Sequence, residues 1–280
     1  MQPLDFQKPT VAEITARARA FFAFHEEQYR DIRDSGLQPR WATIIAAPTG
    51  VGKSMSAAMV ADAIGASLCR ISAPSYMPSG AHNRTTKESI GVIAQHVAQH
   101  DRTILFLDEL DKINDQENVW QGYCRNELYD LIGGDWPTGM NLPELDKGPD
   151  PTIEELTKKL RTTVFFLAAG TFQQFFDGAC ERRTMGFGAQ DQENEVITAD
   201  IIAQNIPREM ANRFGKIVRL PELGEKDYRQ IAREAERKLP ERLREKFRAE
   251  TSQRIEMALR DKKGVRFIEE ALTDVLIDMS

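Results

Sequence analysis

The hydrophobic positions fall into short apolar runs that are separated by longer stretches with helical spacing. The runs at residues 41–47, 103–107 and 163–169 are apolar at nearly every position, and shorter strands are expected at 67–72 and 216–220. A strand that is apolar on both faces is typical of a parallel sheet covered by helices on both sides. The pattern therefore predicts an α/β fold with a parallel sheet flanked by helices.

The chain outside these runs is mainly helical in pattern. Between Val11 and Arg33, apolar residues recur at helical spacing, which favours a helix packed on the main domain over an arm that contacts a partner. The break Pro221–Gly224 separates the last predicted strand from a helical region. We therefore expect three parts: a helical arm at 1–40, a large α/β domain at 41–220 and a small helical lid at 221–280.

The first apolar run leads into the sequence APTGVGKS at residues 47–54. This is the phosphate-loop pattern G-x-x-x-x-G-K-[ST], with Ala47 in place of the first glycine. Glycines allow backbone N–H groups to curl around a phosphate chain, and the following helix N-terminus adds partial positive charge. Lys53 would reach the β- and γ-phosphates, and Ser54 would ligate Mg²⁺. The nucleotide-binding residues expected here are Pro48, Thr49, Gly50, Val51, Gly52, Lys53, Ser54 and Met55.

An acidic pair follows the second apolar run, in the sequence ILFLDELDKI. Asp108 and Glu109 would lie at the carboxyl edge of the sheet, where ligands of open α/β sheets bind. Asp108 is expected to hold Mg²⁺ with Ser54, and Glu109 to orient and deprotonate the attacking water. Thr171, after the third run, would lie at the same edge and assist. Each motif alone also fits an ordinary strand end, but together they predict Mg²⁺-dependent ATP hydrolysis.

Composition argues against several other classes of function. The 280 residues carry a formal net charge of −6, which argues weakly against a broad nucleic-acid surface. No apolar run approaches the roughly 18 residues that a membrane span needs, and the N-terminus lacks the layout of a signal peptide. The widely spaced Cys69, Cys124 and Cys180 form no C-x-x-C motif, which fits a reducing cytoplasm.

Two weaker patterns each have two interpretations. His96 and His100 stand four residues apart on one predicted helix and could form a metal pair. A solvated helix face is favoured, because no cysteine or further histidine is near in sequence. Residues 225–266 carry many Lys and Arg, but Glu and Asp interleave with them. This mixture favours a solvated helical face with i, i+4 ion pairs over a nucleic-acid groove.

Taken in order, the motifs resemble those of the AAA+ ATPases, and within them the ClpX and HslU unfoldase branch, over roughly residues 42–280. FFLAAGTFQQFFDG resembles the sensor-1 strand, and RTMGFGA resembles the loop by which ClpX docks on its peptidase. IPREMANRFG resembles the arginine-finger segment, and GVRFIEEAL the sensor-2 helix. The resemblance implies a finger at Arg213, a γ-phosphate contact from Arg266 in the lid, and a docking loop at Met185-Gly186-Phe187.

The same resemblance implies a homo-oligomer, expected to be a hexameric ring or spiral, in which Arg213 reaches a neighbour's nucleotide. Two features depart from the branch. ClpX begins with a zinc-binding cysteine domain, whereas residues 1–40 contain no cysteine. Ala81-His82-Asn83-Arg84 stands at the place of the family's Gly-Tyr-Val-Gly pore loop, with Tyr76 upstream, so an aromatic paddle for gripping polypeptide is not evident.

Three functions remain open for the motion that ATP hydrolysis would drive. The first is remodelling or unfolding of a protein partner. The second is handling of nucleic acid, as a loader or a regulator of transposition. The third is a nucleotide-dependent switch that assembles or gates a partner complex, for example in a defence or mobile-element system. We rank them in that order, with a small gap between the first and the third because the paddle is missing.

Overall fold

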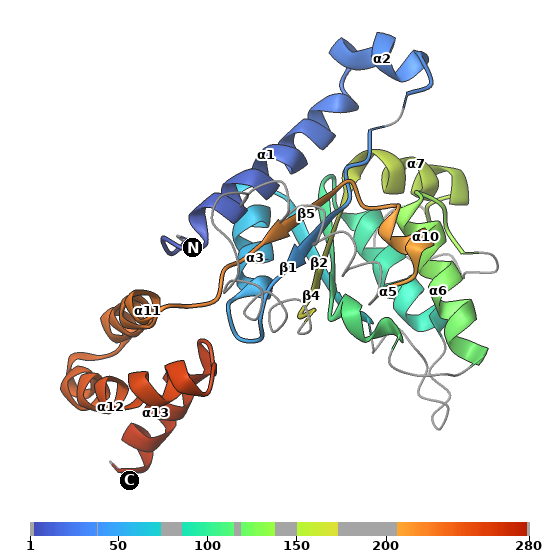
Figure 1. The fold of residues 1–280 in the computed structure, drawn as a ribbon. Coiled ribbons are helices and arrows are strands. Elements are labelled where there is room, and N and C mark those ends of the chain that lie inside the picture. The colour runs from blue at the N-terminus through green and yellow to red at the C-terminus, as the bar shows by residue number, and fades with distance from the viewer. Residues whose placement is uncertain are drawn as a thin grey trace, which may run out of the picture.

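The computed structural model of the protein describes residues 3–37, 39–73, 86–114, 119–137, 150–172 and 206–278. Its strands are β1 (Thr43–Ala46), β2 (Ser67–Ser72), β3 (Thr103–Asp108), β4 (Val164–Gly170) and β5 (Lys216–Arg219). They form a parallel sheet with the spatial order β2-β3-β4-β1-β5 (Figure 1). The three central strands are buried at every position, whereas the edge strands β2 and β5 are partly exposed. The predicted α/β fold with a parallel sheet is confirmed.

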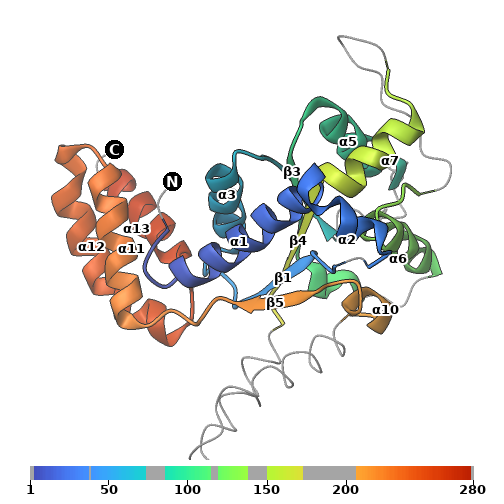
Figure 2. The ribbon, with the colours of Figure 1, turned by 90° about the horizontal axis from the view of Figure 1, so that it is seen from above.

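Helices α1 (Lys8–Phe24) and α3 (Lys53–Ile64) cover one face of this sheet (Figures 1 and 2). Their apolar side chains share one core with sheet residues that include Phe106 and Phe165. The helical segment predicted from Val11 to Arg33 is interrupted after Phe24. The short elements η1 (Glu27–Tyr29) and α2 (Arg30–Asp34) follow, and α2 buries no residue. Helix α1 therefore packs on the large domain, as the favoured interpretation expects.

The opposite face is covered by α5 (Thr86–Gln99), α6 (Val119–Ile132) and α7 (Ile153–Thr163), with η2 (Leu110–Asn114) and α10 (Arg208–Ala211) beside them. Helix α7 begins with a capping box, in which the Thr152 hydroxyl accepts the Glu155 N–H and the Glu155 carboxylate accepts the Thr152 N–H. It runs directly into β4. The sequence between residues 133 and 160 predicts a loop with a short helical stretch, and the structure has there a helix of 11 residues that ends where the strand begins.

Three further helices form the C-terminal region, α11 (Glu225–Lys238), α12 (Glu241–Arg260) and α13 (Arg266–Ile277). The buried hydroxyl of Tyr228 links them, since it donates to the Ala258 carbonyl at 3.2 Å and accepts the Gly264 N–H at 3.0 Å. Leu4 and Phe6, from the start of the chain, pack against the same apolar cluster. The N-terminal segment therefore lies between the helical region and the sheet (Figure 2).

The charged surface of these helices carries short-range ion pairs. Arg229 pairs with Glu225, and Arg254 pairs with Glu250, each at i, i+4. This agrees with a solvated helical face, the favoured interpretation of residues 225–266. Within the ranges given above, none of the helices combines the length and the apolar character that crossing a membrane requires.

Replacing Phe21 by alanine should destabilise the protein by about 3–5 kcal/mol, as is typical for removing a buried aromatic ring. Phe21 is buried between α1 and the sheet, with its ring centroid 5.9 Å from that of Phe165. Thermal unfolding followed by circular dichroism measures the loss. Phe24→Ala is the matched control on the same helix, where the side chain is only partly buried and a smaller loss is expected. Equal melting temperatures for the wild type and Phe21→Ala would contradict the packing of α1 into the core.

Candidate functional site

The phosphate loop, residues 47–52, joins β1 to α3 through a sharp backbone turn. Gly50 and Gly52 have φ angles of +77° and +90°, in the left-handed region that favours glycine. Neither position has room for a side chain. A Cβ on Gly50 would lie 2.8 Å from the Lys263 carbonyl oxygen, and one on Gly52 would lie 2.7 Å from the Gln7 amide nitrogen. Gly50 is therefore required by backbone conformation and by close packing against backbone, and Gly52 by backbone conformation.

Ala47, which replaces the first glycine of the motif, is fully buried. Its φ is not positive, so its place in the loop does not demand glycine. Its N–H donates to the Gly170 carbonyl at 3.2 Å, which ties the start of the loop to the end of β4. The departure from the motif therefore leaves the loop conformation intact.

Lys53 is the first residue of α3, and its side chain turns back over the loop. Its ammonium donates to the carbonyl oxygens of Ala47 at 2.9 Å and Pro48 at 3.0 Å. Burial lowers the pKa of this ammonium, while the negative charges of Asp108 and Asp111 oppose that effect. The cation is thus held inside the curve of the loop, where the motif predicts phosphate binding.

Ser54 and Asp108 come together from α3 and β3, as the motifs predict. The Ser54 hydroxyl donates to Asp108 Oδ2 at 3.0 Å. The same carboxylate oxygen accepts a hydrogen bond from the Arg70 guanidinium at 2.6 Å. A hydroxyl and a carboxylate are the oxygen donors that suit Mg²⁺, so the residues present fit a metal at this place.

Glu109 follows β3 in an unusual backbone conformation, with φ +59° for a residue that is not glycine. Its N–H donates to Asp108 Oδ1 at 3.0 Å. Its side chain accepts from the Lys112 ammonium at 2.6 Å and from the Ser72 hydroxyl at 3.2 Å. The two acids of the pair therefore point different ways and have separate partners.

Thr171 comes directly after β4, at the same carboxyl edge of the sheet, and is partly buried. Close by lies Asp111, whose Oδ1 is buried and has no hydrogen-bond partner in the described part of the chain. A Cβ on Gly170 would lie 2.5 Å from the buried Phe172 ring and 2.8 Å from that oxygen, so both side chains would have to shift. The edge of the sheet thus gathers Asp108, Glu109, Asp111 and Thr171.

The C-terminal helices contact the phosphate loop through their own backbone. The N–H of Val265 donates to the Gly50 carbonyl at 2.7 Å, just before α13 begins at Arg266. Arg266 is the residue after Val265 and the first of α13, so the backbone hydrogen bond to Gly50 brings this end of the helix to the loop. Arg266 is therefore near the predicted phosphate site of its own chain.

Arg213 is exposed and lies on another part of the surface. Its guanidinium carbon is 5.6 Å from the centroid of the Tyr129 ring, on α6. Helix α10 precedes β5 and the C-terminal helices follow it, so the two lie at opposite ends of this strand (Figures 1 and 2). The structure does not bring Arg213 to the Lys53 of its own chain.

The predicted docking loop, Met185-Gly186-Phe187, and the pore segment 81–84 with Tyr76 lie outside the described residues. His96 and His100 are described, and their rings stack with centroids 4.2 Å apart. The His100 Nδ1 lies 2.8 Å from the His96 carbonyl oxygen. Among the residues that the structure covers, no group of three or more metal-binding side chains is found.

Sequence reasoning missed several partners of the site: Gln7, Arg70, Ser72, Asp111 and Lys112. Arg70 and Ser72 had only part of a signal, because alternate residues of the predicted strand share a face. The neighbour of that strand, β3, became known only from the structure. Asp111 and Lys112 stand inside the quoted acidic segment. Gln7 had no signal, since its contact with Gly52 depends on how the N-terminal segment packs.

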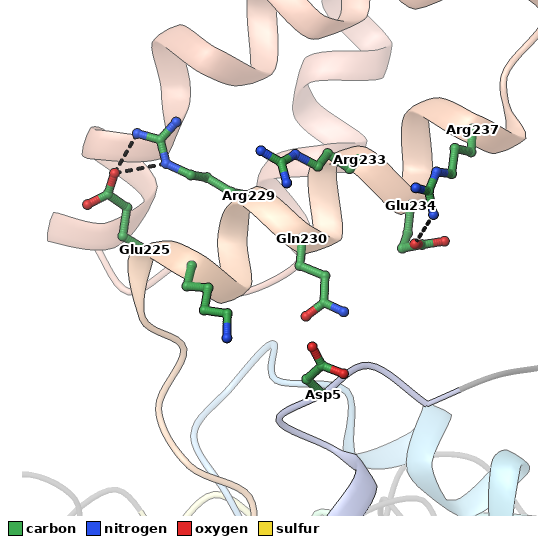
Figure 3. A pocket seen from close by; sticks show the side chains of 8 residues that line it. Asp5, Glu225, Arg229, Gln230, Arg233, Glu234 and Arg237 are labelled. Atoms are coloured by element: carbon green, nitrogen blue, oxygen red, sulfur yellow. Dashed lines mark hydrogen bonds and ion pairs between the residues drawn. The ribbon is translucent and has the colours of Figure 1, made fainter.

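An open groove of about 560 Å³ lies apart from the phosphate loop, between the N-terminal segment and α11 (Figure 3). It is lined by charged or amide side chains: Asp5, Glu225, Lys226, Arg229, Gln230, Arg233, Glu234 and Arg237. Several of these charges already pair, since Arg229 contacts Glu225 and Arg237 contacts Glu234. None of the predicted nucleotide-binding residues lines this groove.

Comparison with known proteins agrees with this geometry. The profile of the ATPase family associated with various cellular activities (AAA) matches residues 43–222, more than half of the chain. That range contains the phosphate loop, the acidic pair and all five strands of the sheet. No curated protein matches the chain. The profile describes the family as a whole and does not select a branch of it. The chain belongs to the AAA family of ATPases, whose domain binds and hydrolyses ATP.

Proposed function

We propose that several copies of this chain form an assembly in which ATP hydrolysis remodels a protein partner. The observation that carries the proposal is the position of two arginines relative to the phosphate loop. Arg266 follows Val265, whose N–H is hydrogen-bonded to the loop of its own chain at Gly50, whereas Arg213 lies at the other end of β5, beside α6. A site that uses both would need two chains, so hydrolysis would be coupled to contacts between subunits.

Within one chain, the backbone amides of residues 48–55 and the Lys53 ammonium would bind the phosphates. Ser54 and Asp108 would hold Mg²⁺, which neutralises phosphate charge when bound. Lys53 already lies inside the loop, so a small movement of its flexible side chain would exchange the Ala47 and Pro48 carbonyls for phosphate oxygens. Arg266 would contact the γ-phosphate from the C-terminal helices.

Glu109 would orient the attacking water and accept its proton. To do so its carboxylate must leave the Lys112 ammonium and the Ser72 hydroxyl, which hold it in this structure. Thr171 would assist from the neighbouring strand end. The structure thus suits a resting state from which Glu109 is released when the site is complete.

Arg213 would act on the nucleotide of the neighbouring subunit. This arrangement implies a homo-oligomer, which we propose to be a hexameric ring or spiral in the cytoplasm. Closure at each subunit interface would move the C-terminal helices, because the Val265 N–H donates a hydrogen bond to the phosphate loop at the Gly50 carbonyl. Residues 73–86 and 133–160, which follow β2 and α6, would transmit the movement to the partner.

A nucleotide-dependent switch that assembles or gates a partner complex is the second candidate. The observation that favours it is the sequence Ala81-His82-Asn83-Arg84, which has no aromatic residue where the unfoldases carry one. Handling of nucleic acid is not favoured, because the basic residues of α11 and α12 include several paired with acids on the same helices. Variants of Glu109, Arg213 and Phe187 test the hydrolytic site, the shared site and the docking loop separately.

Glu109→Gln should keep ATP binding and reduce turnover by about 10²–10⁴-fold, the usual contribution of a positioned base. Steady-state phosphate release and binding of a fluorescent ATP analogue measure the two effects. Lys53→Ala serves as the comparison, because it should lose nucleotide affinity as well. Wild-type turnover by Glu109→Gln would exclude Glu109 as the base. Isolation of this variant in ATP, followed by identification of the molecules bound to it, would also show whether the partner is a protein or a nucleic acid.

Arg213→Ala should bind ATP but hydrolyse it poorly, since a finger supplied by a neighbour contributes about 10³–10⁵ to phosphoryl transfer. Mixing this variant with Lys53→Ala should restore part of the ATPase activity, because one chain brings the finger and the other an intact loop. Arg208, an exposed arginine at the start of α10, is the reserve candidate for the finger, so Arg208→Ala is measured beside Arg213→Ala for comparison. No restoration at any mixing ratio, with a monomer in ATP by light scattering, would contradict the shared site.

Phe187→Ala should weaken partner binding and leave basal ATPase activity and melting temperature nearly unchanged. Its glycine-flanked position between polar stretches suits an anchor that inserts into an apolar pocket of a partner, such as a ClpP-like peptidase ring. Binding is measured with the partner recovered from the Glu109→Gln trap. A melting temperature lowered by several degrees, with binding intact, would assign Phe187 to the core and end the docking proposal.

A further inference from the structure

Arg70, on strand β2, contacts the carboxylate oxygen that faces the predicted metal position. Its Nη2 lies 2.6 Å from Asp108 Oδ2, and the Ser54 hydroxyl donates to that same oxygen at 3.0 Å. The two side chains differ in exposure, since that of Arg70 is 58% exposed and that of Asp108 is 10% exposed. An exposed guanidinium is therefore paired with a nearly buried carboxylate.

The geometry of the sheet explains why Arg70 reaches this place. Strand β2 pairs with β3 in parallel register, with Ser72 opposite Asp108. Leu68 packs in the core on the α1 and α3 face, whereas Cys69 and Ile71 pack in the core on the other face. Because side chains alternate along a strand, Arg70 projects on the α3 face, the side from which Ser54 approaches.

We propose that Arg70 is a positioning residue that sets the metal affinity of the site by pairing with Asp108 until a divalent cation takes its place. The proposal rests on the proposed roles of Ser54 and Asp108 as metal ligands. Two cations cannot both contact one carboxylate oxygen without strong mutual repulsion, so metal binding and the Arg70 contact compete. The exposed guanidinium has solvent to move into, which makes the exchange reversible.

The contact has two consequences before the metal arrives. It holds the Asp108 carboxylate in the orientation that also accepts the Ser54 hydroxyl, so the ligands are already converged. It also neutralises a nearly buried negative charge, which would otherwise be costly without a partner. Because a divalent cation has to displace Arg70, the contact would raise the Mg²⁺ concentration needed for half occupancy of the site.

Lys112 provides a matched comparison close to the same site. It is similarly exposed, at 47%, and its ammonium contacts an acid at the same 2.6 Å. Its partner is Glu109, however, which has no proposed role as a metal ligand. Removal of Lys112 changes the local charge by the same amount as removal of Arg70 but leaves Asp108 Oδ2 occupied. A general change in the electrostatic field and direct competition for Asp108 are therefore distinguishable.

The experiment titrates Mg²⁺ into the full chain with a fluorescent ATP analogue that is not hydrolysed. It records the half-maximal Mg²⁺ concentration, at which half of the Mg²⁺-dependent increase in affinity for the analogue is reached. Arg70→Gln should lower this concentration about fivefold, the upper end of the effect of an exposed ion pair. Lys112→Gln should change it less than twofold. Arg70→Lys, which keeps the charge, should stay near the wild type. Unfolding curves establish that each variant is folded, which is expected because both side chains are at the surface.

Each outcome has a definite meaning. The role of Arg70 would be overturned if folded Arg70→Gln had an unchanged or higher half-maximal Mg²⁺ concentration, or if Lys112→Gln lowered this concentration equally. Either result would leave the nucleotide site in place. Analogue binding that does not respond to Mg²⁺ in the wild type would instead overturn the metal ligands, and with them this proposal. A selective decrease for Arg70→Gln supports competition at Asp108.

Discussion

The parallel register of the sheet is the constraint on which the rest of the site depends. Parallel pairing of β1 with β4 and of β4 with β3 brings the carboxyl ends of all three strands to one edge. The phosphate loop, Thr171 and the acidic pair each follow one of these ends. No long-range loop has to position them, because strands that are buried on both faces fix the edge rigidly. Catalytic geometry is thus a product of core packing.

The second determinant of the site is the pairing of charged side chains at the carboxyl edge of the sheet. Lys53 contacts two loop carbonyls, Arg70 contacts Asp108, and Lys112 contacts Glu109. Each of these contacts satisfies a charge in the structure as it stands, and each would have to change when phosphates and a divalent metal bind. In the proposed function, ligand binding would therefore proceed by exchange of these partners. Asp111 is the exception, since its buried Oδ1 has no hydrogen-bond partner among the described residues.

The sequence predicted the strands and the position of the acidic pair well, because both depend on local patterns. Continuous apolar runs identify buried strands, and the glycines of the loop have a specific backbone requirement that the φ angles of Gly50 and Gly52 bear out. Contacts between distant segments were beyond such patterns. Nothing in the sequence indicated that Gln7 would lie against Gly52, or that Lys263 and Val265 would contact Gly50. These contacts depend on the packing of both termini around the loop.

The same packing ties the phosphate loop to both the N-terminal segment and the C-terminal helices. Gly50 is enclosed by the backbone of residues 263–264 and bonded to Val265, while Gly52 touches Gln7. Leu4 and Phe6 then join the apolar cluster of the C-terminal helices. At Gly50 the loop meets backbone, which cannot relax by a simple change of rotamer, whereas at Gly52 it meets the side chain of Gln7. The hydrogen bond from Val265 to Gly50 thus couples the loop conformation to the position of the C-terminal helices, and the proposed transmission of movement depends on this coupling.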